Sequence, residues 1–169
     1  MEEKCSQDGE NSSPDSGFYR LYFKGLIREE TKGTLVAGFG VAICSQQDDI
    51  LFQMKGSIHN SAITVLEAEL LALKRGLTEA VSLGVTHISI YCDHYQIFEL
   101  VKGRCAPEKD SLALLMNDVQ RIRQQLTSST PIMVTRDQTN KFAYKLALET
   151  LVSKIRFRCF NRCRINLAS

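Results

Sequence analysis

Two acidic side chains are the main candidates for chemistry in this sequence. Glu69 lies in a segment whose apolar residues recur at helical spacing, and it shares a face with Leu66 and Leu73, beside the apolar stripe. Asp93 directly follows a short strand pattern. Carboxylates that meet at one point can hold Mg²⁺, which prefers carboxylate and water oxygens. Because a helix flank or a strand end often carries an acid for no chemical reason, this interpretation depends on the elements that position the two residues.

Other chemical motifs lack the context that they need. Gly38 and Gly40 lie inside a strand pattern with no helix after it, so they do not form a phosphate-binding loop. Cys159 and Cys163 are a single pair, whereas a structural zinc site uses four ligands. The histidines are expected to be structural or solvated: His59, His87 and His94.

The composition is that of a globular protein of one domain with two short tails. The 169 residues carry a net charge of only +2, so no overall basic field indicates nucleic acid. We predict an acidic, disordered segment over 1–17, a folded domain over 18–152 and a basic tail over 153–169. No apolar run approaches the ~18 residues of a membrane span. With no apolar leader at the N-terminus and six scattered cysteines, we expect reduced thiols and a cytoplasmic or nuclear protein.

The elements that would position the two acids can be read from the hydrophobic pattern. Three strand patterns come first, then a long helix that Gly84 can end, a fourth strand, two helices, a fifth strand and a last helix that Thr139 could cap. The order βββαβααβα predicts an α/β fold, with one five-stranded mixed sheet and helices on its faces. The strands are expected at 19–26, 35–44, 50–58, 87–92 and 131–135.

This order of elements, with an acid on the first long helix and another after strand four, resembles the type 1 ribonuclease H-like fold. Three segments carry the resemblance: 66–73, which contains Glu69; 88–93, which ends in Asp93; and 136–147, which opens the last helix. The segments 19–26, 52–56 and 91–93 are also similar to the ribonuclease H-like domain of plant RING-between-RING ubiquitin ligases. The zinc-binding ligase module of those proteins is absent from these 169 residues.

The resemblance implies two-metal hydrolysis of RNA–DNA hybrids by four carboxylates. Glu69 and Asp93 match two of these positions, and Glu69 fits better than Glu67, which lies nearer the polar face. The strand-one position holds Lys24 and the last-helix position holds Tyr144. Replacing an acid by Lys24 changes the local charge by two units, each worth roughly 4 kcal/mol to a unit charge at ~4 Å and an effective dielectric near 20. We therefore expect Lys24 to pair with Asp93 or Glu69 in place of a metal.

The predicted function is a nucleic-acid-binding domain with a degenerate active site, a pseudoenzyme without cofactor. One alternative is an active hybrid ribonuclease that uses Mg²⁺ or Mn²⁺ at Glu69 and Asp93, with Asp137 as a further carboxylate. Another is a protein-interaction domain with a partner in the ubiquitin pathway. Candidate phosphate contacts are Lys102, Arg104, Arg121 and Arg123, and the tail adds a basic-aromatic tract at 156–164.

Overall fold

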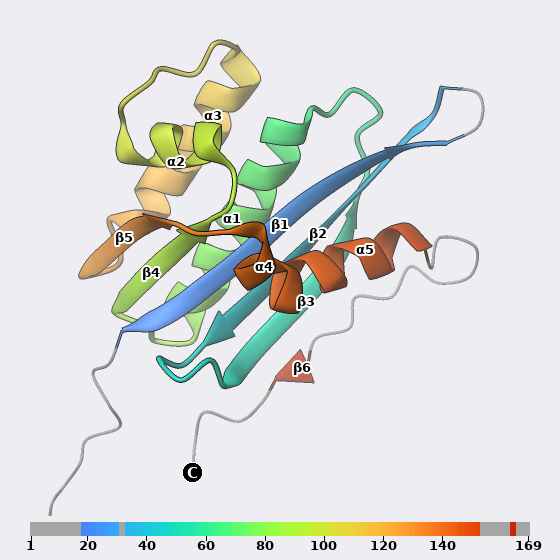
Figure 1. Cartoon of the computed structure of the whole chain (residues 1–169). Coiled ribbons are helices and arrows are strands. Elements are labelled where there is room, and N and C mark those ends of the chain that lie inside the picture. The colour runs from blue at the N-terminus through green and yellow to red at the C-terminus, as the bar shows by residue number, and fades with distance from the viewer. Residues whose placement is uncertain (1–17, 31–32, 153–162, 165–169) are drawn as a thin grey trace, which may run out of the picture.

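The structure is a computed structural model that describes residues 18–30, 33–152 and 163–164. Its elements follow the predicted order along the chain (Figure 1). The strands are β1 (Tyr19–Glu29), β2 (Leu35–Cys44), β3 (Ile50–Ile58), β4 (His87–Cys92), β5 (Ser128–Met133) and β6 (Cys163–Arg164). The helices are α1 (Val65–Ser82), α2 (Tyr95–Lys102), α3 (Asp110–Arg123), α4 (Arg136–Thr139), the π-helical η1 (Asn140–Tyr144) and α5 (Lys145–Val152).

The strands form one mixed sheet in the order β5-β4-β1-β2-β3-β6. The first three strands form an antiparallel meander, and β4 then returns parallel to β1. The five predicted strands and their mixed sheet are confirmed, and β4 is parallel to its neighbour β1, as predicted for a strand that follows a crossover helix. β6 adds a sixth strand of two residues, which pairs with Phe52 and Gln53 at the outer edge of β3. A strand of two residues is too short to show a hydrophobic alternation, so the sequence pattern could not predict β6.

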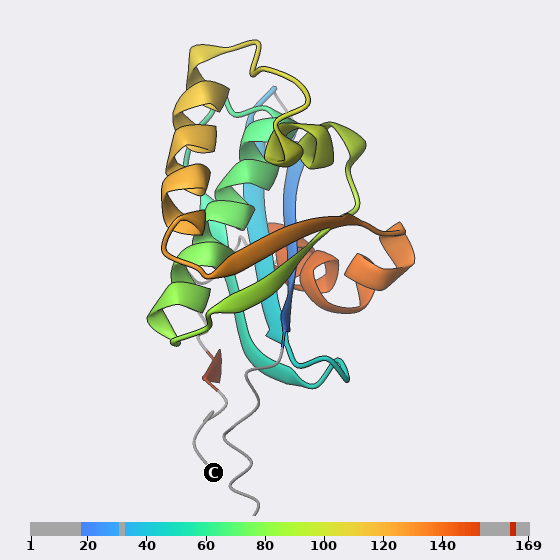
Figure 2. The same ribbon diagram turned by 90° about the vertical axis from the view of Figure 1, so that its left-hand side faces the viewer.

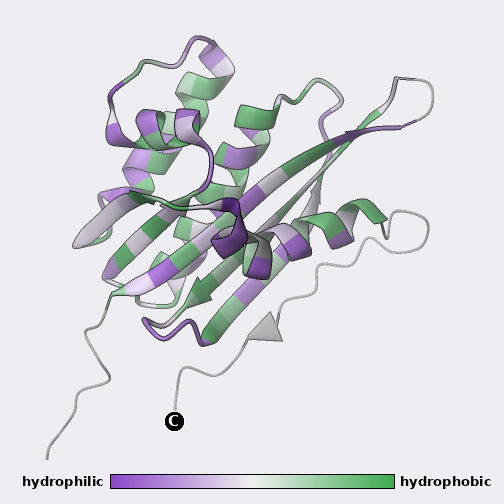
Figure 3. Ribbon diagram, viewed as in Figure 1, coloured by the Kyte–Doolittle hydropathy of each residue, from purple (hydrophilic) through white to green (hydrophobic). Residues whose placement is uncertain are grey.

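The helices cover both faces of this sheet (Figure 2). α1, α2 and α3 lie on one face, and the last helical segment, α4 through α5, lies on the other. Successive side chains of β1 point to opposite faces of the sheet. Leu21 and Phe23 belong to the large core under α1, while Tyr22 packs with Phe142 on the opposite face. Figure 3 shows hydrophobic residues along the central strands, whereas α4 is strongly hydrophilic. This arrangement leaves β1 between the two helical layers.

α1 is fixed at both ends by local interactions. Thr64 accepts a hydrogen bond from the backbone N–H of Glu67 at 3.3 Å and donates one to its Oε1 at 3.1 Å. Thr64 is therefore the N-cap of α1, and its side chain satisfies one of the backbone N–H groups that a helix start leaves without a partner. At the other end Gly84 has a φ of +80°, as predicted for the residue that ends this helix. Glu69 lies in the second turn of this helix, directly after the capped first turn.

Several boundaries differ from the prediction. β1 extends to Glu29 rather than to residue 26, and β5 ends at Met133 rather than at residue 135. β5 begins at Ser128 because its pairing with β4 starts there, although Ser128 to Thr130 carry no apolar signal. The last helical segment begins at Arg136, so Thr139 lies inside it and does not cap it, which corrects the prediction. Residues 1–17 and almost all of the predicted tail lie outside the described residues, and the domain boundaries stay predictions.

Candidate functional site

Lys24 and Asp93 lie where two central strands separate. β1 and β4 pair in parallel from Tyr19 opposite Ile88 to Tyr22 opposite Tyr91, and Lys24 and Asp93 follow these last paired residues. At Lys24, β1 is therefore no longer hydrogen-bonded to β4. The side chain of Lys24 can reach the end of β4.

Gly25 brings α1 close to this point. A Cβ at position 25 would lie 2.2 Å from the backbone carbonyl carbon of Ala68 and 2.5 Å from the backbone nitrogen of Glu69. No side chain fits in that space, so the glycine lets the helix backbone rest on the strand. This close approach sets Glu69 beside Lys24.

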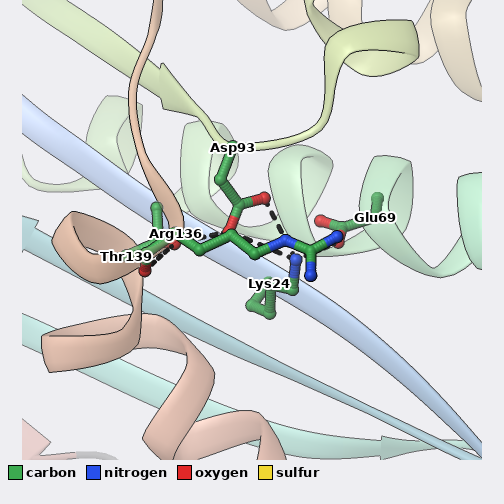
Figure 4. A network of polar contacts seen from close by, with 5 residues as sticks. All are labelled: Lys24, Glu69, Asp93, Arg136 and Thr139. Carbon is green, nitrogen blue, oxygen red and sulfur yellow. Dashed lines mark hydrogen bonds and ion pairs between the residues drawn. The ribbon is translucent and has the colours of Figure 1, made fainter.

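The three side chains form a buried ionic cluster (Figure 4). Lys24 Nζ lies 3.0 Å from Asp93 Oδ1, 3.2 Å from Asp93 Oδ2 and 3.0 Å from Glu69 Oε1. The side chains of Lys24, Glu69 and Asp93 are 12%, 1% and 2% exposed, so water screens their charges weakly. The predicted ion pair of Lys24 is thus confirmed, and it involves both acids.

Thr139 completes the cluster from the last helical segment. The hydroxyl of Thr139 donates a short hydrogen bond to Asp93 Oδ2. Thr139 Oγ1 also lies 3.1 Å from the carbonyl oxygen of Arg136. Thr139 is fully buried. The sequence pattern missed this contact, because a threonine before an apolar stripe has the same appearance as a helix cap.

Burial and charge act against each other in this cluster. Burial raises the pKa of Glu69 to about 7, although the ammonium of Lys24 favours the ionised form. Burial lowers the pKa of Lys24, but the charges of Glu69 and Asp93 outweigh it and the net shift is upward. The neighbouring His94 has a lowered pKa because of its burial and the positive charges of Lys24 and Arg136. At neutral pH Lys24 is therefore a fixed cation between two acidic groups.

Other candidate residues lie outside the cluster. No hydrogen bond among the described residues joins the half-buried Tyr144 to Lys24 or to either acid, and Asp137 is exposed in α4. Glu67 accepts hydrogen bonds from Thr64 and from Ser111 Oγ at 3.2 Å, so it is occupied structurally. In the part of the chain that the structure describes, no three His, Cys, Asp or Glu side chains gather as metal ligands.

The four candidate phosphate-binding residues divide into exposed and engaged groups. Lys102 and Arg104 are exposed, and both lie over the ring of Phe98, at 5.3 and 5.9 Å from its centroid. Arg121 is exposed beside Asp118, with 3.4 Å between their charged atoms. Arg123 donates to Ser129 Oγ at 2.8 Å, to the Val101 carbonyl at 2.8 Å and to the Ser129 carbonyl at 2.9 Å. Its guanidinium joins α2, α3 and β5, so its donors are used within the fold.

The mixed sheet, its two helical layers and the acids on α1 and after β4 define a ribonuclease H-like domain. Residues 25–150 match the family described as Reverse transcriptase-like. The chain belongs to this family.

Among the described residues, none of the helices has the length and hydropathy to span a membrane.

Solved structures with this fold include three ribonucleases H. The N-terminal RNase H domain of rv2228c from Mycobacterium tuberculosis has a TM-score of 0.72 and 22% identity, covering 81% of this chain and 95% of its own. RNase H1 from Halobacterium salinarum has a TM-score of 0.71 and 22% identity, and the match covers 80% of this chain and 98% of that protein. LC11-RNase H1, solved in complex with an RNA/DNA hybrid, has a TM-score of 0.72 and 17% identity, and the match covers 82% of this chain and 99% of that protein. At these identities the likeness concerns the fold.

A curated plant protein is far more similar in sequence. The E3 ubiquitin-protein ligase RSL1 of Arabidopsis thaliana is 60% identical over 137 residues, which are 81% of this chain and 34% of the ligase. The resemblance to a domain of plant ubiquitin ligases is therefore confirmed. The chain spans about a third of the length of this relative.

Proposed function

We propose that this domain is a ribonuclease H-like module without hydrolytic activity that binds nucleic acid through its surface. The observation that carries the first half of the proposal is the ammonium of Lys24, 3.0 Å from both Glu69 and Asp93. It stands between the two carboxylates where a hydrolytic site would need cations.

Two-metal hydrolysis makes demands that this group of side chains does not meet. Two Mg²⁺ ions, ~3.5–4 Å apart, need several carboxylate oxygens at ~2.0–2.1 Å each. Here two carboxylates already neutralise one buried ammonium, and the last helical segment contributes the uncharged hydroxyl of Thr139. A divalent ion would have to displace Lys24 and meet its repulsion, so the site does not fit magnesium.

The surface at the end of α2 supports nucleic-acid binding. Lys102 and Arg104 are exposed, and their side chains lie over one aromatic ring, Phe98. Arg121 adds a third exposed cation on α3. Clustered Lys and Arg side chains attract phosphates and release counterions, which makes such binding sensitive to salt. The solved complex of LC11-RNase H1 with an RNA/DNA hybrid makes the hybrid the first ligand to test.

One pair of assays tests the two halves of this proposal. With Mg²⁺ or Mn²⁺, the protein is expected to leave a labelled RNA–DNA hybrid uncut, at the level of the Asp93→Asn variant. In a filter or anisotropy assay it is expected to bind the hybrid with an affinity that falls as salt is added, and Lys102→Glu with Arg104→Glu should weaken this binding. Turnover that disappears in Asp93→Asn would overturn the first half, and no binding at low salt would overturn the second.

A second function is favoured by the identity to a ubiquitin ligase. At 60% identity over most of this chain, RSL1 carries a domain of this kind within a ligase. The domain would then recruit a protein partner to ubiquitin transfer. This function becomes the better one if the hybrid is not bound at low salt while a partner protein is.

A further inference from the structure

A groove lined by lysines lies on the face of the sheet opposite α1. It is a hollow of about 250 Å³ between β3 and the last helical segment. Its lining includes Gln53 and Lys55 from β3, and Lys141, Lys145 and Leu146 from η1 and α5. We call it the lysine groove. It is separate from the cluster at Lys24 and from the cations around Phe98.

Among the described residues, the lining of the lysine groove carries more positive than negative charge. Lys55 pairs with Glu149 at 2.7 Å. Lys141 lies 5.4 Å from the ring centroid of Phe142, and no ion pair of the described residues includes Lys141 or Lys145. These two lysines are four positions apart, about one helical turn, so they lie on one face of the segment. Among the described residues, the lining has three lysines and one acid, Glu149. Two positive charges are therefore left that a ligand can neutralise.

The walls of the groove favour a peptide over a nucleic acid. Ile50 and Leu146 contribute aliphatic surface, and Phe142 is only 6% exposed. Single-stranded nucleic acids gain affinity by stacking bases on exposed aromatic rings, and the lining of this groove has no such ring. Carboxylates next to an aliphatic side chain would match both the charge and the apolar wall.

We propose that the lysine groove binds an acidic peptide segment of a partner protein. Its Asp or Glu carboxylates face Lys141 and Lys145, and an aliphatic side chain rests against Leu146. This goes beyond nucleic-acid binding and concerns a different face of the sheet.

The probe for the test is a fluorescein-labelled peptide of three Asp-Glu-Leu repeats, with Asn-Gln-Leu repeats as its neutral match. Fluorescence anisotropy with the full chain should show binding of the acidic peptide alone, weakened by salt. Lys141→Glu with Lys145→Glu should weaken it at least ~tenfold, since close charge pairs across an interface become repulsive. The matched control, Lys102→Glu with Arg104→Glu, makes the same change of charge on another surface and should weaken it less than ~twofold.

Several results would overturn the proposal. They are an equal loss in both variants, equal binding of the two peptides, or a groove variant that loses affinity for an RNA–DNA hybrid and keeps the peptide. The acidic residues at 1–16 are a competing occupant. If neutralising them in the full chain tightens peptide binding at least ~tenfold, the groove serves this segment and the proposed partner is wrong. Lys141→Gln with Lys145→Gln, checked by thermal unfolding, separates lost charge from lost folding and should also weaken peptide binding.

Discussion

Lys24 contacts two carboxylates that come from different elements, and this makes it important for stability as well as for the chemistry of the site. Glu69 comes from α1 and Asp93 from the end of β4, so the ammonium connects β1 to both. Replacing a buried ion cluster by apolar groups can be neutral, but removing one partner leaves a buried charge unpaired.

Lys24→Met is expected to destabilise the fold strongly at neutral pH. The cost should approach ~3–5 kcal/mol, because Asp93 and Glu69 would remain buried side by side without a cation. Urea unfolding at pH 7 measures it. Lys74→Met is the matched control, since Lys74 pairs with Asp118 at 2.9 Å on the surface and such pairs contribute ~0–1 kcal/mol. Equal effects in the two variants would mean that the Lys24 cluster is not a strong interaction.

Glu69 should give stability a dependence on pH. Its pKa in the folded chain is raised from 4.5 to about 7 by burial, so the folded state holds this proton more tightly than the unfolded state. The free energy of unfolding should therefore decrease as the pH rises from about 4.5 to about 7, by roughly 1–3 kcal/mol. Urea unfolding of the wild type and of Glu69→Gln across this window tests the sign. A difference between them that grows in favour of the wild type as pH rises would contradict it.

Close packing of the helices against the sheet positions the side chains of the cluster around Lys24. Gly25 lets α1 rest on β1, and Gly40 does the same for the last helical segment, where a Cβ would lie 2.2 Å from the carbonyl oxygen of Ala143. The helices that carry Glu69 and Thr139 are therefore held against the sheet by positions that have no side chain.

Gly25→Ala should separate α1 from β1. A methyl group there would collide with the backbone of Ala68, and overpacking of this kind costs ~1–3 kcal/mol or more. Gly84→Ala is the comparison, because nothing lies within 4 Å of a Cβ there and only the φ of +80° is strained, at a cost of ~1–2 kcal/mol. Thermal unfolding of both should show the larger loss for Gly25→Ala, and the reverse order would contradict the close approach.

The hydrophobic pattern predicted the elements better than it predicted the contacts between them. Glu69 and Asp93 could be placed because each is fixed within an element of strong periodicity, an amphipathic helix or a strand end. Thr139 could not, because its contact with Asp93 depends on how the last segment is docked. The same applies to Arg123, a surface cation by sequence whose guanidinium joins three elements in the structure. Lys141 and Lys145 form a groove only once β3 lies beside them.

At the scale of the whole molecule, the domain combines a ribonuclease H-like sheet with charged surfaces in separate places. The cations around Phe98 lie at the end of α2, and the lysine groove lies across the sheet between β3 and the last helical segment. Under the proposal that Lys24 closes the hydrolytic centre, the domain can still use such surfaces to bind other molecules.

Calorimetric titration of Mn²⁺ into the wild type and into Lys24→Asp tests the closed centre most directly. The wild type is expected to show no saturable binding at millimolar Mn²⁺, whereas Lys24→Asp should gain a site that is lost again in Lys24→Asp with Asp93→Asn, because three carboxylates then face one another without an ammonium. Saturable Mn²⁺ binding by the wild type that Asp93→Asn abolishes would contradict the account.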